Sequence, residues 1–553
     1  MGLVYLYLIL TSFFSSILIV PPLRQWAVNS GRLDLPERRK IHKEAIPRIG
    51  GVAIFLSFLF SLLVFYEFNH IVRGLIAGSV VVFLVGLLDD LTGLTPKQKF
   101  LGQGIAAALA ITLSGVYLTD LGNLVGVGNV ILPIWLAIPF TVFAIVGVAN
   151  AINMFDGLDG LAGGTSVLVL GGFLFLAWQD QNYLVVAVAM ALIGAILGFL
   201  KDNSYPATIF MGDSGSLVLG FVVGFLAVML TQAETSSVSA IVPVVMLGLP
   251  IIDTLTVMVR RVKKGKSPFF PDLTHMHHKF LNLGFHHRFT VIVIYTVTLV
   301  WVLLAILFHE TVPDYLFFGG YLAFVITLYA LLRKMLDQPQ KFKFLQSDSD
   351  AGVRESNFYI RLLSANKYIV FTLFVLVVGY FLLSATSCSV FNQQYFIQTT
   401  VIVLLSGLFM LFARPESRPR MSMTFYVSAI ILTVFITEQN CGVISFGNVQ
   451  LENMINSIFV LVGLSVIYLI AFRRKGEMYL TTPLDFLLLA ITVTLAIVSP
   501  EIGQNFRLTD VCIKAIVLIL AVKILASRSR MMERCVYWGL QIVLITFVLK
   551  NII

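Results

Sequence analysis

Apolar runs of membrane-spanning length recur from one end of the chain to the other. Each run approaches the roughly 20 residues that a helix needs to cross the hydrocarbon core of a bilayer. Such a segment must be helical, because lipid offers an open backbone no hydrogen-bond partner. The pattern therefore predicts an all-α polytopic membrane protein with about eighteen transmembrane helices and with its polar chemistry in the loops at the helix ends.

The first apolar run, from Leu3 to Val20, lies where a secretory signal peptide would lie. No basic segment precedes it, and Pro21, Pro22 and Arg24 follow it in place of a small-residue cleavage site. Both features are atypical of a cleaved signal. We therefore expect this run to be a retained first helix.

Composition agrees with a membrane protein and narrows the classes of function. Of the 553 residues, 58% are hydrophobic and only 12% are charged, which is far from the balance of a water-soluble domain. The net charge of +9 does not indicate nucleic-acid binding, because the basic residues lie in short loops where they set membrane orientation and meet anionic lipid. The cysteines show no C-x-x-C spacing, so neither a zinc site nor a disulfide framework is predicted. They are Cys388, Cys441, Cys512 and Cys535.

Basic loops and nearly uncharged loops alternate along the chain. Cytoplasmic loops of membrane proteins carry an excess of Lys and Arg, so we expect the basic loops on the cytoplasmic side. These loops are residues 32–48, 97–99, 260–279, 333–343, 414–420, 473–475 and 528–534. The assignment places both ends of the chain outside.

The polar content of the loops divides the chain into three parts. Loops rich in Asp, Asn, His and Gly are confined to residues 1–332, which we interpret as the membrane domain that carries the chemistry. Residues 333–365 are expected to form a cytoplasmic linker. Residues 366–553 follow as a second membrane domain of about seven helices, and no motif assigns its function.

Acidic residues of the first domain gather at helix ends on the predicted cytoplasmic side. Asp89 and Asp90 end the third span, Asp156 and Asp159 lie in N-A-I-N-M-F-D-G-L-D-G, and Asp213 lies in F-M-G-D-S-G-S. Neighbouring carboxylates repel one another beside the low-dielectric core, so a cation is expected to neutralise them. Oxygen donors favour a hard ion such as Mg²⁺, which commonly binds phosphate as well. The alternative is that these residues only cap helices, but three clusters on one face favour the metal.

Two basic segments on the same side are candidates for binding phosphate. One is S-P-F-F-P-D-L-T-H-M-H-H-K-F at residues 267–280, whose histidines could instead bind zinc. Because no matching second set of zinc ligands is found, we favour contact with a diphosphate. The other is the segment 34–51, which contains Lys43 and Arg48. The histidines at 286–287 are interpreted as membrane-interface residues.

Together these segments resemble the polyprenyl-phosphate N-acetylhexosamine-1-phosphate transferases, the family that includes phospho-N-acetylmuramoyl-pentapeptide transferase. The resemblance rests on N-x-x-N-x-x-D-G-L-D-G, F-M-G-D-S-G-S and D-x-x-H-x-H-H in this order, within residues 1–332. It implies transfer of a sugar 1-phosphate from a UDP-N-acetylhexosamine to undecaprenyl phosphate, with release of UMP. The H-M-H-H form looks more like the simple N-acetylhexosamine transferases. This likeness implies initiation of a surface polysaccharide or of teichoic acid at the bacterial inner (cytoplasmic) membrane.

The resemblance also implies roles for individual residues. Asn153 and Asp213 would hold Mg²⁺, or Mn²⁺ in its place. The implied catalytic residues are Asp89, Asp90, Asp156, Asp159 and His275, with Asp89 as the base that keeps the lipid phosphate ionised. The implied substrate-binding residues are Lys43, Asn150, Asn203, Phe210, His277 and His278, with Phe210 stacked on uracil. Direct in-line attack is favoured over a covalent phospho-enzyme, and both are kept as alternatives.

Two other classes of protein compete with this interpretation. A transporter or flippase of a lipid-linked sugar should carry polar residues near the midplane of its helices, whereas the acids here lie at helix ends. A lipid-binding scaffold with an inactive site would lack part of the acidic clusters, which are complete. The helices beyond residue 332 exceed what the family requires. They could handle the lipid product, recruit a partner glycosyltransferase or mediate a homodimer.

Overall fold

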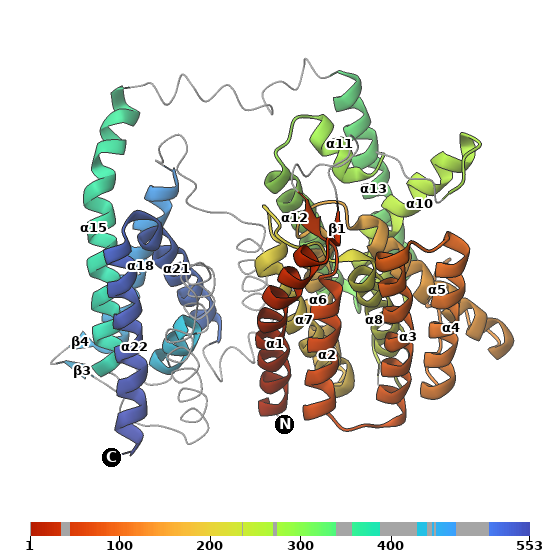
Figure 1. Ribbon diagram of the computed structural model, residues 1–553, viewed down its shortest axis with the longest axis horizontal. Helices are drawn as coiled ribbons and strands as arrows, with labels where there is room; N and C mark the ends of the chain where they lie inside the picture. The colour runs from red at the N-terminus through yellow and green to blue at the C-terminus, as the bar shows by residue number, and fades with distance from the viewer. Residues whose placement is uncertain are drawn as a thin grey trace. The chain divides into compact units, whose positions relative to one another are not determined.

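The described part of the chain folds almost entirely into helices in the computed structural model. The structure describes residues 2–34, 45–234, 236–268, 274–338, 357–386, 429–438, 445–446, 449–471 and 508–552. They divide into two compact units, one formed by residues before 339 and one by residues after 356 in the sequence (Figure 1). The helical architecture confirms the predicted all-α class.

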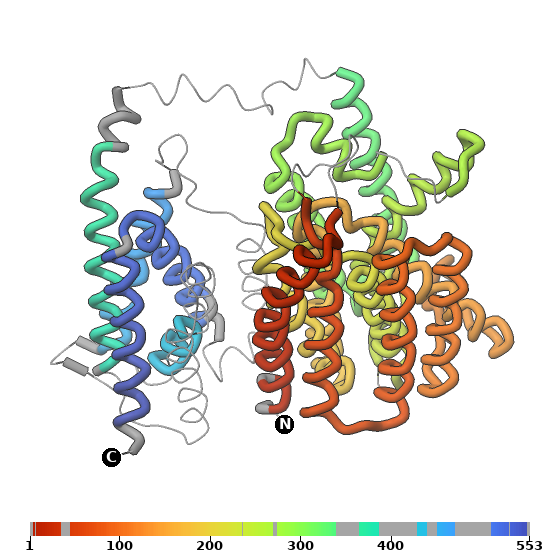
Figure 2. Tube along the Cα trace, viewed as in Figure 1, coloured from red at the N-terminus to blue at the C-terminus, as the bar shows by residue number. Residues whose placement is uncertain are grey.

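The first unit consists of helices that run in alternating directions, with one pair of very short strands (Figure 2). It begins with α1 (Gly2–Asn29), β1 (Leu33–Asp34), β2 (Ile46–Pro47) and α2 (Gly51–Phe65). It continues with α3 (His70–Thr92), α4 (Pro96–Ser114), α5 (Ile134–Phe155), α6 (Leu161–Gln179), α7 (Tyr183–Asn203) and α8 (Gly212–Gln232). It closes with α9 (Ile241–Met246), α10 (Gly248–Lys263), α11 (Met276–Asn282), α12 (His287–Phe308) and α13 (Asp314–Asp337).

Helix α8 forms the core of the first unit and packs against α5, α3, α2 and α6. It is apolar on all sides, and 89% of its most apolar 18-residue window is buried, as expected of a helix surrounded by other helices. A Cβ atom on Gly220 would lie 2.5 Å from the Cα atom of Ala149 in α5. Small residues allow such close approach between membrane helices. This packing fixes the start of α8, where Asp213 lies, relative to α3 and α5.

Eleven helices in the described part of the chain are long and apolar enough to cross a membrane. They are Tyr7–Asn29, His70–Thr92, Ile134–Phe155, Leu161–Gln179, Tyr183–Asn203, Gly212–Gln232, His287–Phe308, Asp314–Asp337, Ser364–Ala385, Leu451–Leu469 and Met531–Leu549. They confirm a multi-pass membrane protein. The total of about eighteen spans stays a prediction. The first helix extends through Pro21 and Pro22 to Asn29, beyond the predicted end at Val20.

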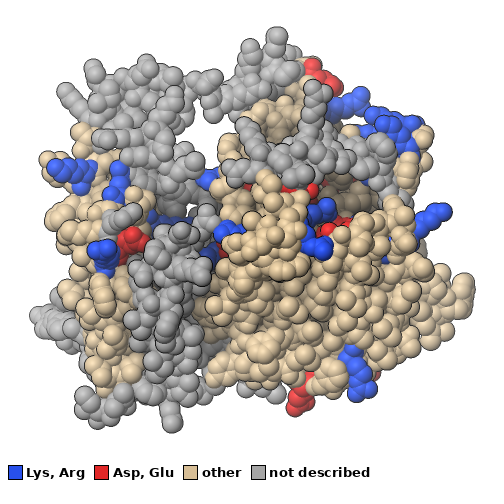
Figure 3. Space-filling model, viewed as in Figure 1, with Lys and Arg blue, Asp and Glu red and all other residues tan. Residues whose placement is uncertain are grey.

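One face of the first unit is apolar along much of its helices. Figure 3 shows a nearly uncharged surface on this face, with Lys, Arg, Asp and Glu above and below it. Large apolar side chains such as Leu56, Phe60 and Leu84 are exposed on these helices. An apolar belt between polar ends is the surface that a bilayer requires, so the chemistry is confined to the ends.

The second unit packs α15 (Asn357–Thr386) against α18 (Leu451–Ala471), α21 (Leu508–Arg528) and α22 (Arg530–Ile552). It also contains a helix at Ala429–Glu438 and the paired strands β3 (Ser445–Phe446) and β4 (Val449–Gln450). Inside it, Nζ of Lys514 lies 2.7 Å from Oε1 of Glu438, and both side chains are buried. Helix extends into both ends of the predicted linker 333–365, because α13 reaches Asp337 and α15 begins at Asn357.

Candidate active site

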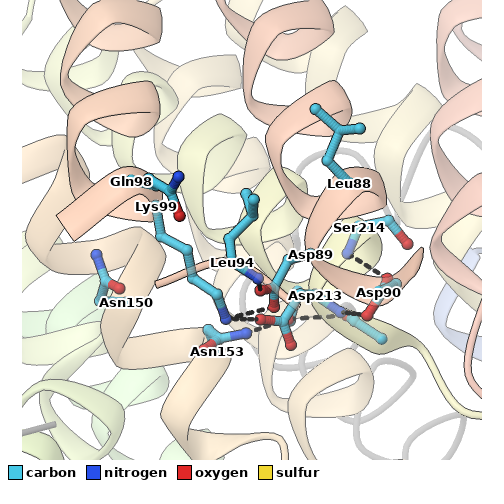
Figure 4. Close-up of polar contacts among 12 residues, drawn as sticks. Leu88, Asp89, Asp90, Leu94, Gln98, Lys99, Asn150, Asn153, Asp213 and Ser214 are labelled. Carbon is cyan, nitrogen blue, oxygen red and sulfur yellow. Dashed lines mark hydrogen bonds and ion pairs between the residues drawn. The ribbon is translucent and has the colours of Figure 1, made fainter. Parts of the chain in front are cut away.

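Acidic residues at the ends of three helices lie close together, and Figure 4 shows those of α3 and α8. Asp89 and Asp90 lie in the last turn of α3, Asp213 lies in the first turn of α8, and Asp156 directly follows α5. The oxygens of Asp90 accept hydrogen bonds from the backbone N–H groups of Asp213 (2.8 Å) and Ser214 (2.9 Å). These bonds join the end of α3 to the start of α8.

The carboxylate of Asp90 thus satisfies backbone donors that a helix leaves unpaired at its N-terminus, which is the role of a capping residue. Its side chain is only 1% exposed and lies outside the lining of the neighbouring cavity. The sequence offered capping as the alternative to a reactive role, and the geometry gives Asp90 a capping role.

Two cations neutralise Asp213. Nη2 of Arg48 lies 2.5 Å from its Oδ1, and Nζ of Lys99 lies 2.5 Å from its Oδ2. Lys99 also forms an ion pair with Asp89, and Nε of Arg48 lies 3.7 Å from Oδ1 of Asp90. Three carboxylates therefore share two positive side chains, and the ionised cluster keeps an excess of negative charge that favours a further cation.

The turn between α3 and α4 places Lys99 beside the acids. Oγ1 of Thr95 accepts a hydrogen bond from the N–H of Gln98, and Oε1 of Gln98 accepts one from the N–H of Thr95. This capping box fixes where α4 begins. The N–H of Leu94 donates to Oδ1 of Asp89 (2.6 Å), which closes the turn. The T-P-K-Q-K sequence thereby directs Lys99 back to the end of α3.

Arg48 is placed by pairing between the segments that precede α2 and α8. The N–H of Phe210 donates to the carbonyl of Pro47 (2.8 Å). A Cβ atom on Gly51 would lie 2.0 Å from the backbone nitrogen of Gly215, so only glycine allows α2 and α8 to begin so close together. The result is that Arg48, one residue after β2, reaches Asp213.

A cavity of about 340 Å³ lies beside this cluster. Of the residues predicted from the sequence, its lining contains Asn153, Asp156, Asp159, Asn203, Phe210, Asp213 and His278. It also contains Asp34, Arg48, Tyr205, Ser216 and His287. The lining does not include Asp89, Asp90, Asn150, His275 or His277, and Lys43 lies outside the described residues. The amide of Asn150 donates instead to Gln103 (2.5 Å) and to the carbonyl of Val146 (2.8 Å).

The D-G-L-D-G turn forms one wall of the cavity and is tied to two other segments. Gly160 has a left-handed backbone (φ 79°), and its N–H donates to Oδ1 of Asn203 at the end of α7 (3.1 Å). The hydroxyl of Tyr295 in α12 donates to the carbonyl of Gly160 (2.5 Å). The N–H of Asp159 donates to Nε2 of His287 (3.0 Å). The turn is therefore held in place by α7 and α12.

The interpretation of His287 as a membrane-interface residue is wrong. Its side chain is 8% exposed, lines the cavity and packs against the ring of Tyr205 with centroids 4.5 Å apart. Cζ of Arg288 lies 5.2 Å from the centre of the same Tyr205 ring. His286 is exposed. Two adjacent histidines at a helix start gave no signal of which one would turn inward.

The three histidines of the H-M-H-H segment have different environments. His278 lines the cavity, whereas His277 is buried beside it with ring centroids 4.3 Å apart. Burial lowers the pKa of His277 well below its usual value, and the neighbouring His278 lowers it further. His277 is therefore neutral at neutral pH and cannot supply positive charge to an anion. Of the two, His278 has the position expected of an anion contact.

Gly157 is expected to be intolerant of a side chain. A Cβ atom there would lie 2.3 Å from Nε2 of His277, and the buried ring has to move to accommodate it. Such overpacking should lower the free energy of unfolding by about 1–3 kcal/mol. The measurement is the unfolding of purified Gly157→Ala in detergent. Gly147→Ala is the control, because nothing lies within 4 Å of a Cβ atom at that position. Equal stability of the two variants would contradict the packing.

Asn153 and Asp213 offer oxygen to a hard cation. Asn153 lines the cavity, and its Nδ2 donates to Oγ of Ser216 (2.8 Å), so the amide oxygen remains as an acceptor. Within the described ranges, no group of three or more His, Cys, Asp or Glu side chains is arranged to hold a metal. Mg²⁺ usually keeps several waters and binds through one or two carboxylates plus substrate phosphates. The donor set fits such an ion once Arg48 or Lys99 releases Asp213.

Sequence reasoning did not single out Lys99 or Tyr205. Lys99 was counted only as part of a basic loop, because Lys and Arg in short loops primarily indicate orientation. The capping signal at Thr95, three residues after the α3 end at Thr92, could have shown that the loop is a tight turn. Tyr205 carried no signal, since its contacts come from α12.

Comparisons with known proteins identify a family that matches part of the first unit. Residues 72–231 match the model of the glycosyl transferase family 4. The chain is 34% identical over 306 residues to the probable undecaprenyl-phosphate N-acetylglucosaminyl 1-phosphate transferase of Bacillus subtilis (strain 168), a match that covers 54% of this chain and 83% of that protein. It is 33% identical over 275 residues to the undecaprenyl-phosphate alpha-N-acetylglucosaminyl 1-phosphate transferase of Salmonella typhi, covering 48% of this chain and 73% of that protein. It is 33% identical over 305 residues to the decaprenyl-phosphate N-acetylglucosaminephosphotransferase of Mycobacterium tuberculosis (strain CDC 1551 / Oshkosh). This match covers 50% of this chain and 75% of that protein.

Proposed function

The chain belongs to glycosyl transferase family 4, and from that premise we propose that it transfers N-acetylhexosamine 1-phosphate from a UDP-sugar to undecaprenyl phosphate. An oxygen of the lipid phosphate forms a bond to the phosphorus that carries the sugar, and the bond from that phosphorus to UMP breaks. The products are undecaprenyl-diphospho-sugar and UMP. In this proposal the lipid-linked sugar initiates a surface polysaccharide at the bacterial cytoplasmic membrane.

The observation that carries this proposal is the cavity at the end of the membrane helices, where carboxylates and cations face one another. Phosphoryl transfer asks a protein mainly to position two anions and neutralise their charge. Arg48 and His278 line the cavity, and Lys99 lies directly behind Asp213. A site at the end of the apolar belt is within reach of a phosphate at headgroup depth, which a soluble enzyme would have to extract from the bilayer.

Roles follow for the residues of the site. Asp213 and Asn153 hold Mg²⁺, which when bound neutralises the charge of the diphosphate. Asp89, paired with Lys99, accepts the proton of the lipid phosphate in a direct attack. Phe210, which lines the cavity, stacks on the uracil ring, and Asp156 and Asp159 line the nucleotide side.

The proposal is tested by incubating the purified full-length protein with undecaprenyl phosphate and a panel of UDP-N-acetylhexosamines. UMP and the lipid product are measured by mass spectrometry. We expect both in equal amounts, for one sugar of the panel above the others, and only when lipid phosphate and Mg²⁺ are present. Absence of UMP with every sugar would overturn the proposal. Movement of a preformed lipid-linked sugar across vesicles would support a flippase instead.

The raised pKa of Asp156 predicts that nucleotide binding depends on pH. Burial raises the pKa of its carboxyl group to about 7, with Asp213 and Asp159 adding to the shift and Arg48 opposing it. Below that pH the carboxyl group of Asp156 is neutral and does not repel a diphosphate. Above that pH it is negatively charged and repels the diphosphate. In chelator, affinity for the UDP-sugar should therefore fall by up to about tenfold per pH unit above 7. Calorimetric titration from pH 6 to pH 8.5 measures this.

The control for this prediction is Asp156→Asn, which keeps the size of the side chain and removes its titration. Its affinity should be independent of pH over the same range. A flat profile for the unmodified protein, or the same slope in the variant, would show that another group titrates.

A further inference from the structure

Asp253 is a fully buried carboxylate on α10 that lies outside the cavity lining. Its oxygens accept three hydrogen bonds, from Nδ1 of His275 (2.7 Å), from the N–H of Met276 (2.8 Å) and from the hydroxyl of Tyr329 (2.6 Å). A buried carboxylate is costly unless its oxygens are satisfied in this way. The three donors belong to the residue before α11, the first residue of α11 and the middle of α13. Asp253 therefore joins three segments at one point.

The contact with Met276 replaces a cap that α11 lacks. No side chain next to the start of α11 caps its free N–H groups, which every helix leaves unpaired at its N-terminus. Asp253 accepts one of them from a different helix. The start of α11 is thus defined by a residue that lies 23 positions away in the sequence.

A second contact holds the middle of α11 to the same tyrosine. Nζ of Lys279 lies 4.0 Å from the centre of the Tyr329 ring, a distance at which a cation is attracted to the face of an aromatic ring. Asp253, Tyr329 and Lys279 together form what we call the α11 clasp. It fixes α11 at its first residue and again three residues later.

The clasp also changes the interpretation of His275, for which the family resemblance implied a catalytic role. Its Nδ1 is bound to Asp253, and its Nε2 lies 3.5 Å from Nη2 of Arg261. Nη1 of Arg261 in turn donates to the carbonyl of Pro268 (2.6 Å). Both ring nitrogens of His275 therefore face protein groups. Three residues later, His278 faces the cavity.

We propose that Asp253 is a positioning residue that, through the α11 clasp, holds His278 in the wall of the cavity. The proposal rests on the proposed function, since it assigns His278 to the diphosphate of the donor. Without the clasp, α11 loses the acceptor for its first N–H and the anchor of His275. His278 then moves away from the substrate phosphates, and a displacement of about 1 Å is enough to cost on the order of 10²-fold in rate.

The test is a double-mutant cycle in the full-length protein. Asp253→Asn keeps the volume of the side chain but presents an amide to the donors. We expect it to lower kcat for UMP release by about 10²-fold and to leave the KM for undecaprenyl phosphate nearly unchanged. In a His278→Ala background it should cause little further loss, because two residues that act through one contact are not additive. A further loss of the same size would show a general structural effect and overturn the proposal.

Hydrogen–deuterium exchange supplies a readout that does not need activity. Backbone amides of α11 should exchange faster in Asp253→Asn, while those of α3 and α8 are unchanged. The control is Asp314→Asn, because Asp314 also accepts hydrogen bonds from a distant N–H and a hydroxyl, those of Asn123 and Ser239, and is not part of the clasp. Unchanged exchange in α11 would overturn the clasp. If the unmodified protein releases no UMP, the proposed function fails, and the exchange measurement still decides whether Asp253 holds α11.

Discussion

Asp213→Asn is expected to lower UMP release by about 10³-fold. Asp213 is the carboxylate that meets both Arg48 and Lys99, and in the proposed function it holds the divalent ion against the donor diphosphate. Asparagine keeps the side-chain size and the backbone N–H that donates to Asp90, so the start of α8 should be preserved. The measurement is the rate of UMP release at saturating Mg²⁺ and both substrates.

The control for Asp213→Asn is Asp180→Asn. Asp180 follows α6 and accepts hydrogen bonds from the N–H and the hydroxyl of Ser237, away from the acidic cluster. This variant should retain nearly full activity. Normal UMP release by Asp213→Asn, with its activity unaffected by chelator, would show that the ion is held elsewhere or is not needed.

Asp89→Asn is expected to lower UMP release by about 10²- to 10⁴-fold at pH 6. The asparagine oxygen can still accept the hydrogen bond from Leu94, but the charge that faces Lys99 and takes the lipid proton is removed. A phosphate monoester has its second pKa near 6, so the lipid phosphate loses its proton unaided as the pH rises. The loss should therefore shrink between pH 6 and pH 8.

The pH profile separates two roles of Asp89. A loss that is the same from pH 6 to pH 8.5 would contradict the role of a base and would indicate that Asp89 acts only by holding Lys99. Lys99→Met, which removes the cation and keeps much of the side-chain length, then serves as the comparison. Lys99→Met should lower UMP release as much as Asp89→Asn does only if Asp89 acts solely by positioning Lys99.

The membrane helices could be predicted from the sequence because bilayer thickness dictates their length and lipid dictates their apolar surface. The end of α3 at Asp89 and Asp90 is one example. The continuation of α1 through Pro21 and Pro22 could not be predicted, since proline usually ends or kinks a helix. Helix α1 packs against α7, and tertiary contacts of this kind leave no local pattern in the sequence.

The meeting of the acids at one end could also be predicted, because alternation of spans places Asp89, Asp156 and Asp213 on one side. The partner that each acid contacts could not be predicted. Asp90 caps α8, and Asp89 binds Lys99, although the two acids are adjacent in the sequence. Neighbouring residues on a helix end point in different directions, and their partners depend on which helices lie next to α3.

The same reason explains the histidines. The H-M-H-H segment indicates a functional region of the sequence, but its three rings have separate environments. His275 faces Asp253, His277 packs against Gly157 and His278 faces the cavity. The partners of Asp253 could not be predicted, because they come from α11 and α13.

The measurement that tests the central claim most directly is electron paramagnetic resonance of Mn²⁺, used in place of Mg²⁺, in the purified full-length protein with a UDP-sugar. The claim is that one divalent ion joins the acidic helix ends to the substrate diphosphate. It predicts one tightly bound Mn²⁺ per chain, with phosphorus hyperfine coupling from the nucleotide, and loss of that signal in Asp213→Asn. Phosphorus coupling of the same strength in Asp213→Asn, or no bound Mn²⁺ in the unmodified protein, would contradict it.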